Sequence, residues 1–303
     1  MDRIQALCRN FLWEGSESYS KAPLVSWKII CLPTKAGGLG VIDSRIWNIA
    51  AVGKLVWWIA SKKDLLWIKW IDKIYLKGRE WFDYQPNANS SWAWRQVCMV
   101  KDKFASGYRN GQWQLQNGHY SIGNGYNWLR QDNLTKVPWF SSVWSRLNTP
   151  KHVFNAWLIK HGRLLTMDRL HKMGITDRMT CYLCGTHDED HAHLIEKCSY
   201  TRRCYERMRA WIGALGNGFG STEQMMKIRH CSGFLRKLLC SLVIAMHYHI
   251  WFARNACRVE YKVIHPSFLV KTVIEDGRLA LLKYQYYHMS QNDREWCISR
   301  GLM

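Results

Sequence analysis

The chain has 303 residues, of which 48% are hydrophobic and only six are prolines, and this composition excludes an intrinsically disordered protein. Its 43 lysines and arginines outnumber 23 aspartates and glutamates, which gives a formal net charge of +20 at pH 7. A folded chain this basic favours a polyanionic partner, with nucleic acid as the first candidate and a membrane surface as the second.

The cysteines indicate the cellular compartment, and the longest apolar segment indicates whether the chain spans a membrane. Eleven cysteines are an odd number, and the N-terminus shows no signal-peptide pattern, so we expect an intracellular, reducing compartment. The apolar run 238–252 contains His247 and His249 and is shorter than the roughly 20 residues of a membrane span. It therefore predicts a buried helix and no membrane partner.

Apolar residues recur at helical spacing over 44–60 and again over 65–76, and these segments are predicted to be helices. The polar stretch 85–91 is a predicted linker. Alternating residues on either side of Asn117–Gly118, from 111 to 122, are typical of a short β-hairpin. A further helix is expected to begin in 125–130.

The C-terminal half also has a helical pattern. Residues 151–173 predict two helices broken near Gly162, with Thr166 as a candidate cap of the second. A helix is expected over 199–212, a glycine-rich loop over 213–220, and two or three helices over 223–290, including a long one over 234–259. The predicted fold class is mainly α with a small β element (α+β), in which a helical zinc-stapled module is flanked by helical segments.

Between the helical regions 151–173 and 199–212, Cys181 and Cys184 are separated by two residues, and Cys198 follows within the same 18-residue window. Two thiolates at this spacing bind one ion from a tight turn, and a histidine and a third cysteine complete a tetrahedral zinc shell. The alternatives are a disulfide or redox pair, which normally lies in a βαβ setting that is not visible here, and buried thiols that act as small apolar side chains. The spacing favours zinc.

The histidine ligand is not settled by spacing alone. Three histidines lie between the cysteine pair and Cys198. His187 follows Cys184 so closely that the loop would be cramped. His191 and His193 both remain candidates.

Several segments together resemble the C-terminal part of plant non-LTR (LINE-type) retroelement reverse transcriptases, including the zinc-binding domain that follows the polymerase. These segments are YSIGNGYNWL (120–129), VWSRLNTPKHVFNAWLIKHGRLLTMDRL (143–170), CYLCGTHDEDHAHLIEKC (181–198), the upstream stretch 11–43 and IWFARN (250–255). The resemblance implies one structural Zn²⁺ and a nuclear location. It also implies four segments: a mostly helical post-palm remnant (1–85), a linker with the start of a hairpin (86–116), the zinc-binding domain (117–212) and a C-terminal helical region (213–303).

The resemblance also assigns the remaining site residues. His193 takes the ligand position, which completes the set Cys181, Cys184, His193 and Cys198. Glu189 takes the acidic position of the motif, and it is expected to hold the second ring nitrogen of His193 if the segment between them is helical.

No adjacent pair of aspartates of the polymerase kind is present, and the carboxylates of the C-terminal third have no predicted strand setting for ribonuclease H chemistry. We therefore expect a non-enzymatic, truncated or decayed element that binds RNA or DNA with little sequence preference and has no small-molecule substrate. The predicted phosphate contacts are Arg202, Arg203, Arg207 and Arg209. The alternative is a zinc-stabilised scaffold that binds another protein and no nucleic acid.

Overall fold

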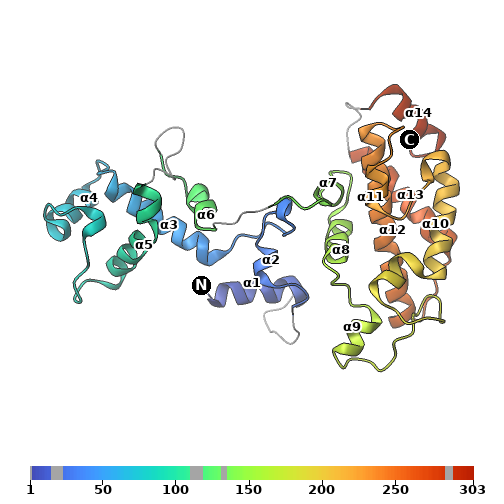
Figure 1. Cartoon of the computed structure of the whole chain (residues 1–303), viewed down its shortest axis with the longest axis horizontal. Helices are drawn as coiled ribbons and strands as arrows, with labels where there is room; N and C mark the ends of the chain where they lie inside the picture. Colours follow the sequence, from blue (N-terminus) through green and yellow to red (C-terminus); the bar gives the residue numbers. More distant parts are fainter. Residues whose placement is uncertain (1, 15–22, 110–118, 131–134, 284–288) are drawn as a thin grey trace. The chain divides into compact units, whose positions relative to one another are not determined.

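The computed structural model describes residues 2–14, 23–109, 119–130, 135–283 and 289–303. It divides into two compact units, formed by residues 1–32 with 39–135 and by residues 33–38 with 136–303 (Figure 1). The division near residue 135 falls inside the predicted segment 117–212, and the four segments proposed from the sequence stay a prediction.

The regular secondary structure described in the first unit is entirely helical. Its helices are α1 (Asp2–Glu14), α2 (Trp27–Ile30), α3 (Ser44–Ala60), α4 (Leu66–Ile71), the π-turn η2 (Asp72–Leu76), η3 (Trp81–Asp83), α5 (Trp92–Arg109) and α6 (Ile122–Arg130). Asp43 begins α3 by accepting hydrogen bonds from the backbone N–H groups of Arg45 and Ile46. The predicted helices 44–60 and 65–76 are confirmed by α3 and by α4 with η2.

Aromatic side chains form the core of this unit. Trp81, Tyr84 and Trp94 pack within 6.5 Å of one another by ring centroids. Lys101 is buried among them, and its ammonium group donates to the carbonyls of Phe82 and Tyr84. These bonds satisfy a charge that would otherwise be costly to bury.

The second unit carries the cysteine cluster. Its elements are η1 (Thr34–Ala36), α7 (Phe140–Val143), α8 (Pro150–Lys160), α9 (Met167–Lys172), the π-turn η4 (His193–Lys197), α10 (Ser199–Ile212), η5 (Gly213–Gly216), α11 (Thr222–Met226), α12 (Gly233–Val259), α13 (Pro266–Lys283) and α14 (Gln291–Ser299). They match the helices predicted for 151–173, 199–212 and 234–259. Gly162 lies just after the end of α8 and has a positive φ of +60°, a conformation that glycine adopts without strain. It separates α8 from α9, as the sequence predicts.

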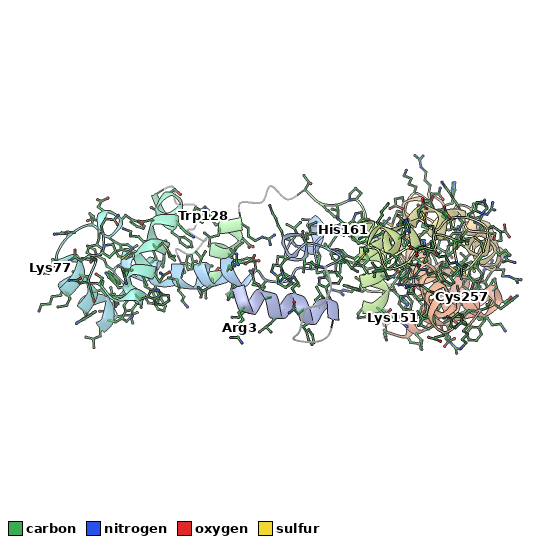
Figure 2. The ribbon with its side chains drawn as sticks, turned by 90° about the horizontal axis from the view of Figure 1, so that it is seen from below. Arg3, Lys77, Trp128, Lys151, His161 and Cys257 are labelled. Carbon is green, nitrogen blue, oxygen red and sulfur yellow. The ribbon has the colours of Figure 1, made fainter. Side chains whose placement is uncertain are left out.

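The long helix α12 is the centre of this unit. It packs against α8, α11 and α13, and α13 also packs against α10 (Figure 1). Cys257, near the C-terminal end of α12, is labelled in Figure 2. Because α12 is buried along most of its length, the elements that approach it from different parts of the chain share one core.

The predicted β element differs from what the structure describes. Residues 111–118 of the proposed hairpin lie outside the described residues, and Ile122, placed on its return strand, is the first residue of α6. In the described part of the chain, β structure is limited to an isolated antiparallel bridge between Thr180 and Asp188. None of the described helices is both long enough and apolar enough to span a membrane.

Candidate metal centre

A tight backbone turn positions the first two cysteines. Glu189 donates its N–H to the carbonyl of Met179 (2.8 Å), and Cys181 donates its own to the carbonyl of His187 (2.8 Å). At the tip, Gly185 adopts a positive φ of +70° and donates to the carbonyl of Cys181. The chain therefore reverses direction between the two cysteines and the histidine-containing segment, and both thiols lie on one side of the turn.

The other two side chains come from the two ends of η4. His193 is its first residue, and its N–H donates to Asp190 Oδ1 at 2.6 Å. Cys198 follows its last residue and donates to the carbonyl of His193 (2.7 Å), a π-type bond across five residues. The wide turn brings the side chains of His193 and Cys198 to the same site, and Cys198 also stands immediately before α10.

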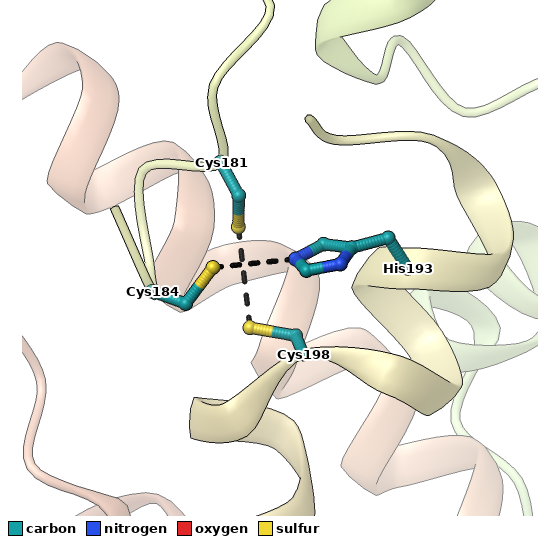
Figure 3. Close-up of side chains that lie close together, drawn as sticks. All are labelled: Cys181, Cys184, His193 and Cys198. Atoms are coloured by element: carbon teal, nitrogen blue, oxygen red, sulfur yellow. Dashed lines mark hydrogen bonds between the residues drawn. The ribbon is translucent and has the colours of Figure 1, made fainter. Parts of the chain in front are cut away.

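Cys181, Cys184, His193 and Cys198 converge on one point (Figure 3), and their ligand atoms all lie within 4.8 Å of one another. Cys181 Sγ and Cys198 Sγ are 4.0 Å apart, and Cys184 Sγ is 3.3 Å from His193 Nε2. In a tetrahedron with Zn–S bonds of about 2.3 Å and a Zn–N bond of about 2.0 Å, ligand atoms lie roughly 3.5–3.8 Å apart. These four residues therefore fit one tetrahedral zinc ion in both chemistry and spacing.

Two of the three thiols, Cys184 and Cys198, are prepared for deprotonation, which metal binding requires. A hydrogen bond from the Cys181 thiol, aided by the backbone N–H groups of Tyr200 and Thr201, lowers the pKa of Cys198 to about 6. The same shared proton, together with burial, raises the pKa of Cys181. Burial alone would raise the pKa of Cys184, but hydrogen bonds from Thr186 and the nearby backbone outweigh it and lower the value to about 7.

The other histidines of the segment lie outside this cluster. His191 is not among the clustered ligand atoms of the described residues, and burial lowers the pKa of its ring. The His187 ring stacks on that of His193 at 5.7 Å, while its Nδ1 lies 2.8 Å from the hydroxyl of Thr186. Of the two histidines that spacing alone leaves as candidates, His193 lies in the cluster of ligand atoms. Its assignment as the ligand, which the motif resemblance implies, stays a prediction.

Glu189 has a different partner from the one predicted. It lies before the helical segment and not one turn inside it, and its fully buried carboxylate pairs with the guanidinium of Arg254 (2.6 and 2.8 Å). The same oxygen, Oε1, accepts the N–H of Met167 (3.1 Å), and Arg254 also donates to the carbonyl of Leu165. Glu189 therefore joins α12 and the start of α9 to the turn that carries Cys181.

Sequence reasoning did not single out Arg254. A signal was present in the sequence, because Arg254 is a charged residue within the apolar helix predicted over 234–259. A charge at such a position needs a buried counter-ion.

The arginines after Cys198 do not all lie in the same environment. Arg202, Arg203 and Arg207 are exposed on α10, and no hydrogen bond or ion pair engages them within the described residues. The guanidinium of Arg209 instead donates from Nε and Nη2 to the carbonyl of Phe219 (3.2 and 2.8 Å). Arg209 therefore also holds the loop after α10, and its role as a phosphate contact stays a prediction.

Comparison with known proteins agrees with this geometry. Residues 120–205 match the family described as zinc-binding in reverse transcriptase. The chain is also 31% identical over 103 residues to an Arabidopsis thaliana protein named "Putative ribonuclease H protein"; the match covers 33% of this chain and 16% of that protein. No solved structure matches the chain. The resemblance to plant retroelement proteins with a reverse-transcriptase zinc-binding domain is thereby confirmed, and the non-LTR class remains a prediction.

Proposed function

We propose that these 303 residues act as a non-catalytic, zinc-dependent nucleic-acid-binding part of a retroelement reverse transcriptase polyprotein. One structural Zn²⁺ would be held by Cys181, Cys184, His193 and Cys198. The observation that carries the proposal is that Cys198 directly precedes α10, whose exposed side includes Arg202, Arg203 and Arg207. The last ligand would therefore fix the start of the helix that presents these charges.

The electrostatics support a phosphate-binding face on α10, which we define as Arg202, Arg203 and Arg207. Cations that lack an internal partner are free to neutralise phosphates and to release condensed counterions. Arg202 also lines a cavity of about 360 Å³ together with Arg209, Glu196 and Glu206, so positive and negative side chains balance inside it. The contact is therefore expected along the open side of the helix, with either RNA or DNA and with little sequence preference.

Replacing Arg202, Arg203 and Arg207 together with alanine is expected to weaken the salt dependence of binding. The slope of log affinity against log salt should fall by about 0.7–0.9 for each lost phosphate contact. Fluorescence anisotropy with labelled single strands of RNA and DNA and with a duplex, at several salt concentrations, measures this slope.

The matched control replaces three exposed lysines of the same unit, Lys237, Lys262 and Lys271. It removes the same net charge and should change the slope less. Equal effects of the two triple variants would show that binding has no preferred face, and an unchanged slope in the arginine variant would show that α10 does not contact phosphate. If the wild-type protein binds no nucleic acid even at low salt, the protein-binding scaffold becomes the better account.

The chain is expected to show no polymerase and no ribonuclease H activity of its own. The two groups of possible metal ligands found among the described residues contain at most one carboxylate each, whereas both reactions use several carboxylates around paired metal ions. Primer extension on an RNA template and cleavage of an RNA–DNA hybrid, with magnesium or manganese, should give background rates. Activity that disappears when one carboxylate of this chain is replaced by its amide would contradict the proposal.

A nuclear, intracellular location is proposed together with this function, because the resemblance is to retroelement proteins and the free thiols of the cluster require reducing conditions.

A further inference from the structure

A second group of possible metal ligands lies in the core of the second unit, away from the cysteines. His152 near the start of α8, His249 in the middle of α12 and Asp276 on α13 place their ligand atoms within 4.8 Å of one another. Because α12 packs against both α8 and α13, the three side chains are positioned by three different elements of one core. Such a set is more rigid than one formed within a loop.

One carboxylate oxygen of Asp276 lies close to both imidazole rings. Asp276 Oδ2 is 2.6 Å from His249 Nε2 and 3.4 Å from His152 Nε2. Around a tetrahedral ion with bonds of about 2.0–2.1 Å, such atoms lie roughly 3.3 Å apart. The separation of Asp276 from His152 already fits one coordination shell, and its separation from His249 would have to widen by about 0.7 Å.

The protein alone leaves this group incompletely satisfied. His152 is only 2% exposed, and its Nε2 has no hydrogen-bond partner. A buried polar atom without a partner lowers the stability of the fold. His249 donates to the carboxylate of Asp276, whose side chain is 16% exposed. The site therefore combines a partly buried anion with one unpartnered ring nitrogen.

The donor chemistry of the three side chains fits a metal ion. A metal ion differs from a proton in that it binds the neutral imidazoles through their lone pairs and the carboxylate through its charge. The donor set of two histidines and one carboxylate also occurs in zinc sites that keep a position for water.

A small cavity borders this group at His249. It has a volume of about 170 Å³, reaches His249, and is lined by apolar side chains that include Phe252 and Phe268. Lys151, labelled in Figure 2, also lines it, and its charge opposes the binding of a cation. The cavity is large enough to admit an ion with its water.

We propose that His152, His249 and Asp276 bind a second divalent transition-metal ion, independent of the cysteine centre, with water completing its shell. The competing explanation is a metal-free hydrogen-bonded network of the same three side chains.

Zinc is the probe that distinguishes these explanations. The full chain, equilibrated in a zinc-buffered solution and then desalted, should contain two zinc ions. Asp276→Asn removes the charge but keeps the size of the side chain, and it should reduce the content to one. His152→Gln, which changes a different helix, should do the same.

His247→Gln is the matched control. His247 is a buried histidine on α12 whose Nε2 lies 3.2 Å from the carbonyl of Gly220, and it is not part of the group. This variant should keep both ions.

Cobalt substitution separates the two centres. Cobalt bound to Cys181, Cys184 and Cys198 gives intense sulfur-to-metal absorption, whereas cobalt on histidine and carboxylate gives only weak visible bands. The Asp276→Asn and His152→Gln variants should keep the sulfur bands and lose the weak component, and Cys184→Ser should do the reverse. Wild-type protein with one zinc ion, or a second ion that remains in both variants, would overturn the proposal.

Discussion

Cys184→Ser is expected to abolish zinc binding at the cysteine centre and to unfold the segment around it. Apparent binding free energies for structural zinc in small domains are about 10–16 kcal/mol at neutral pH, and binding of this kind is coupled to folding. Cys184 is only half-buried, in contrast to Cys181 and Cys198, so a serine there removes a ligand with little loss of packing. The variant should lose the cysteine-bound ion and show a lower melting temperature, measured by metal analysis and thermal unfolding.

Cys257→Ser is the matched control for this variant. Cys257 is also half-buried and lies close to the centre, where its thiol donates to the carbonyl of Tyr182 (3.4 Å), an interaction that a serine hydroxyl can retain. It is not part of the ligand cluster. His191→Ala should likewise keep the ion, while His193→Ala should lose it. The opposite result for the two histidines would overturn the ligand assignment.

Arg254→Met is expected to destabilise the second unit by about 3–5 kcal/mol, because it leaves the carboxylate of Glu189 buried without its counter-ion. Both side chains are at most 1% exposed, so water does not replace the lost partner. Chemical denaturation of the zinc-loaded protein measures the loss. The effect should be accompanied by weaker zinc binding, since Glu189 supports the turn that carries Cys181.

Two further variants test the origin of this effect. Arg258→Met makes the same chemical change one turn later on α12, at a more exposed position, and should cost no more than about 0.5 kcal/mol. Adding Glu189→Gln to Arg254→Met should recover part of the stability, because the unpaired charge is then removed. If Arg254→Met cost no more than Arg258→Met, the ion pair would not be an important stabilising contact.

Local signals account for the parts of the fold that the sequence predicted well. Helix α3 begins directly after its cap residue Asp43 and covers the residues with apolar periodicity. Helix α10 begins directly after Cys198 and ends before Gly213. The cysteine pair can be recognised in the sequence because two thiolates that bind one ion from a tight turn have a fixed spacing. Each of these features depends on residues that are close in sequence.

The features that were missed depend on tertiary packing. Glu189 and Arg254 are 65 positions apart, and nothing local shows that each is the counter-ion of the other. The sequence pairs Glu189 with His193 only if the segment between them is helical. In the structure the helical segment begins after Glu189. Arg209 looks like its neighbours in sequence, and only the fold of the following loop brings the carbonyl of Phe219 to it.

The coordination shell of the zinc centre is the central claim, and X-ray absorption at the zinc edge tests it most directly. The Asp276→Asn variant is the suitable sample, because it is expected to hold the cysteine-bound ion alone. The predicted shell has three sulfur atoms at about 2.3 Å and one nitrogen at about 2.0–2.1 Å. A shell with two or fewer sulfur atoms, or one that consists mainly of nitrogen and oxygen, would contradict the assignment of Cys181, Cys184, His193 and Cys198.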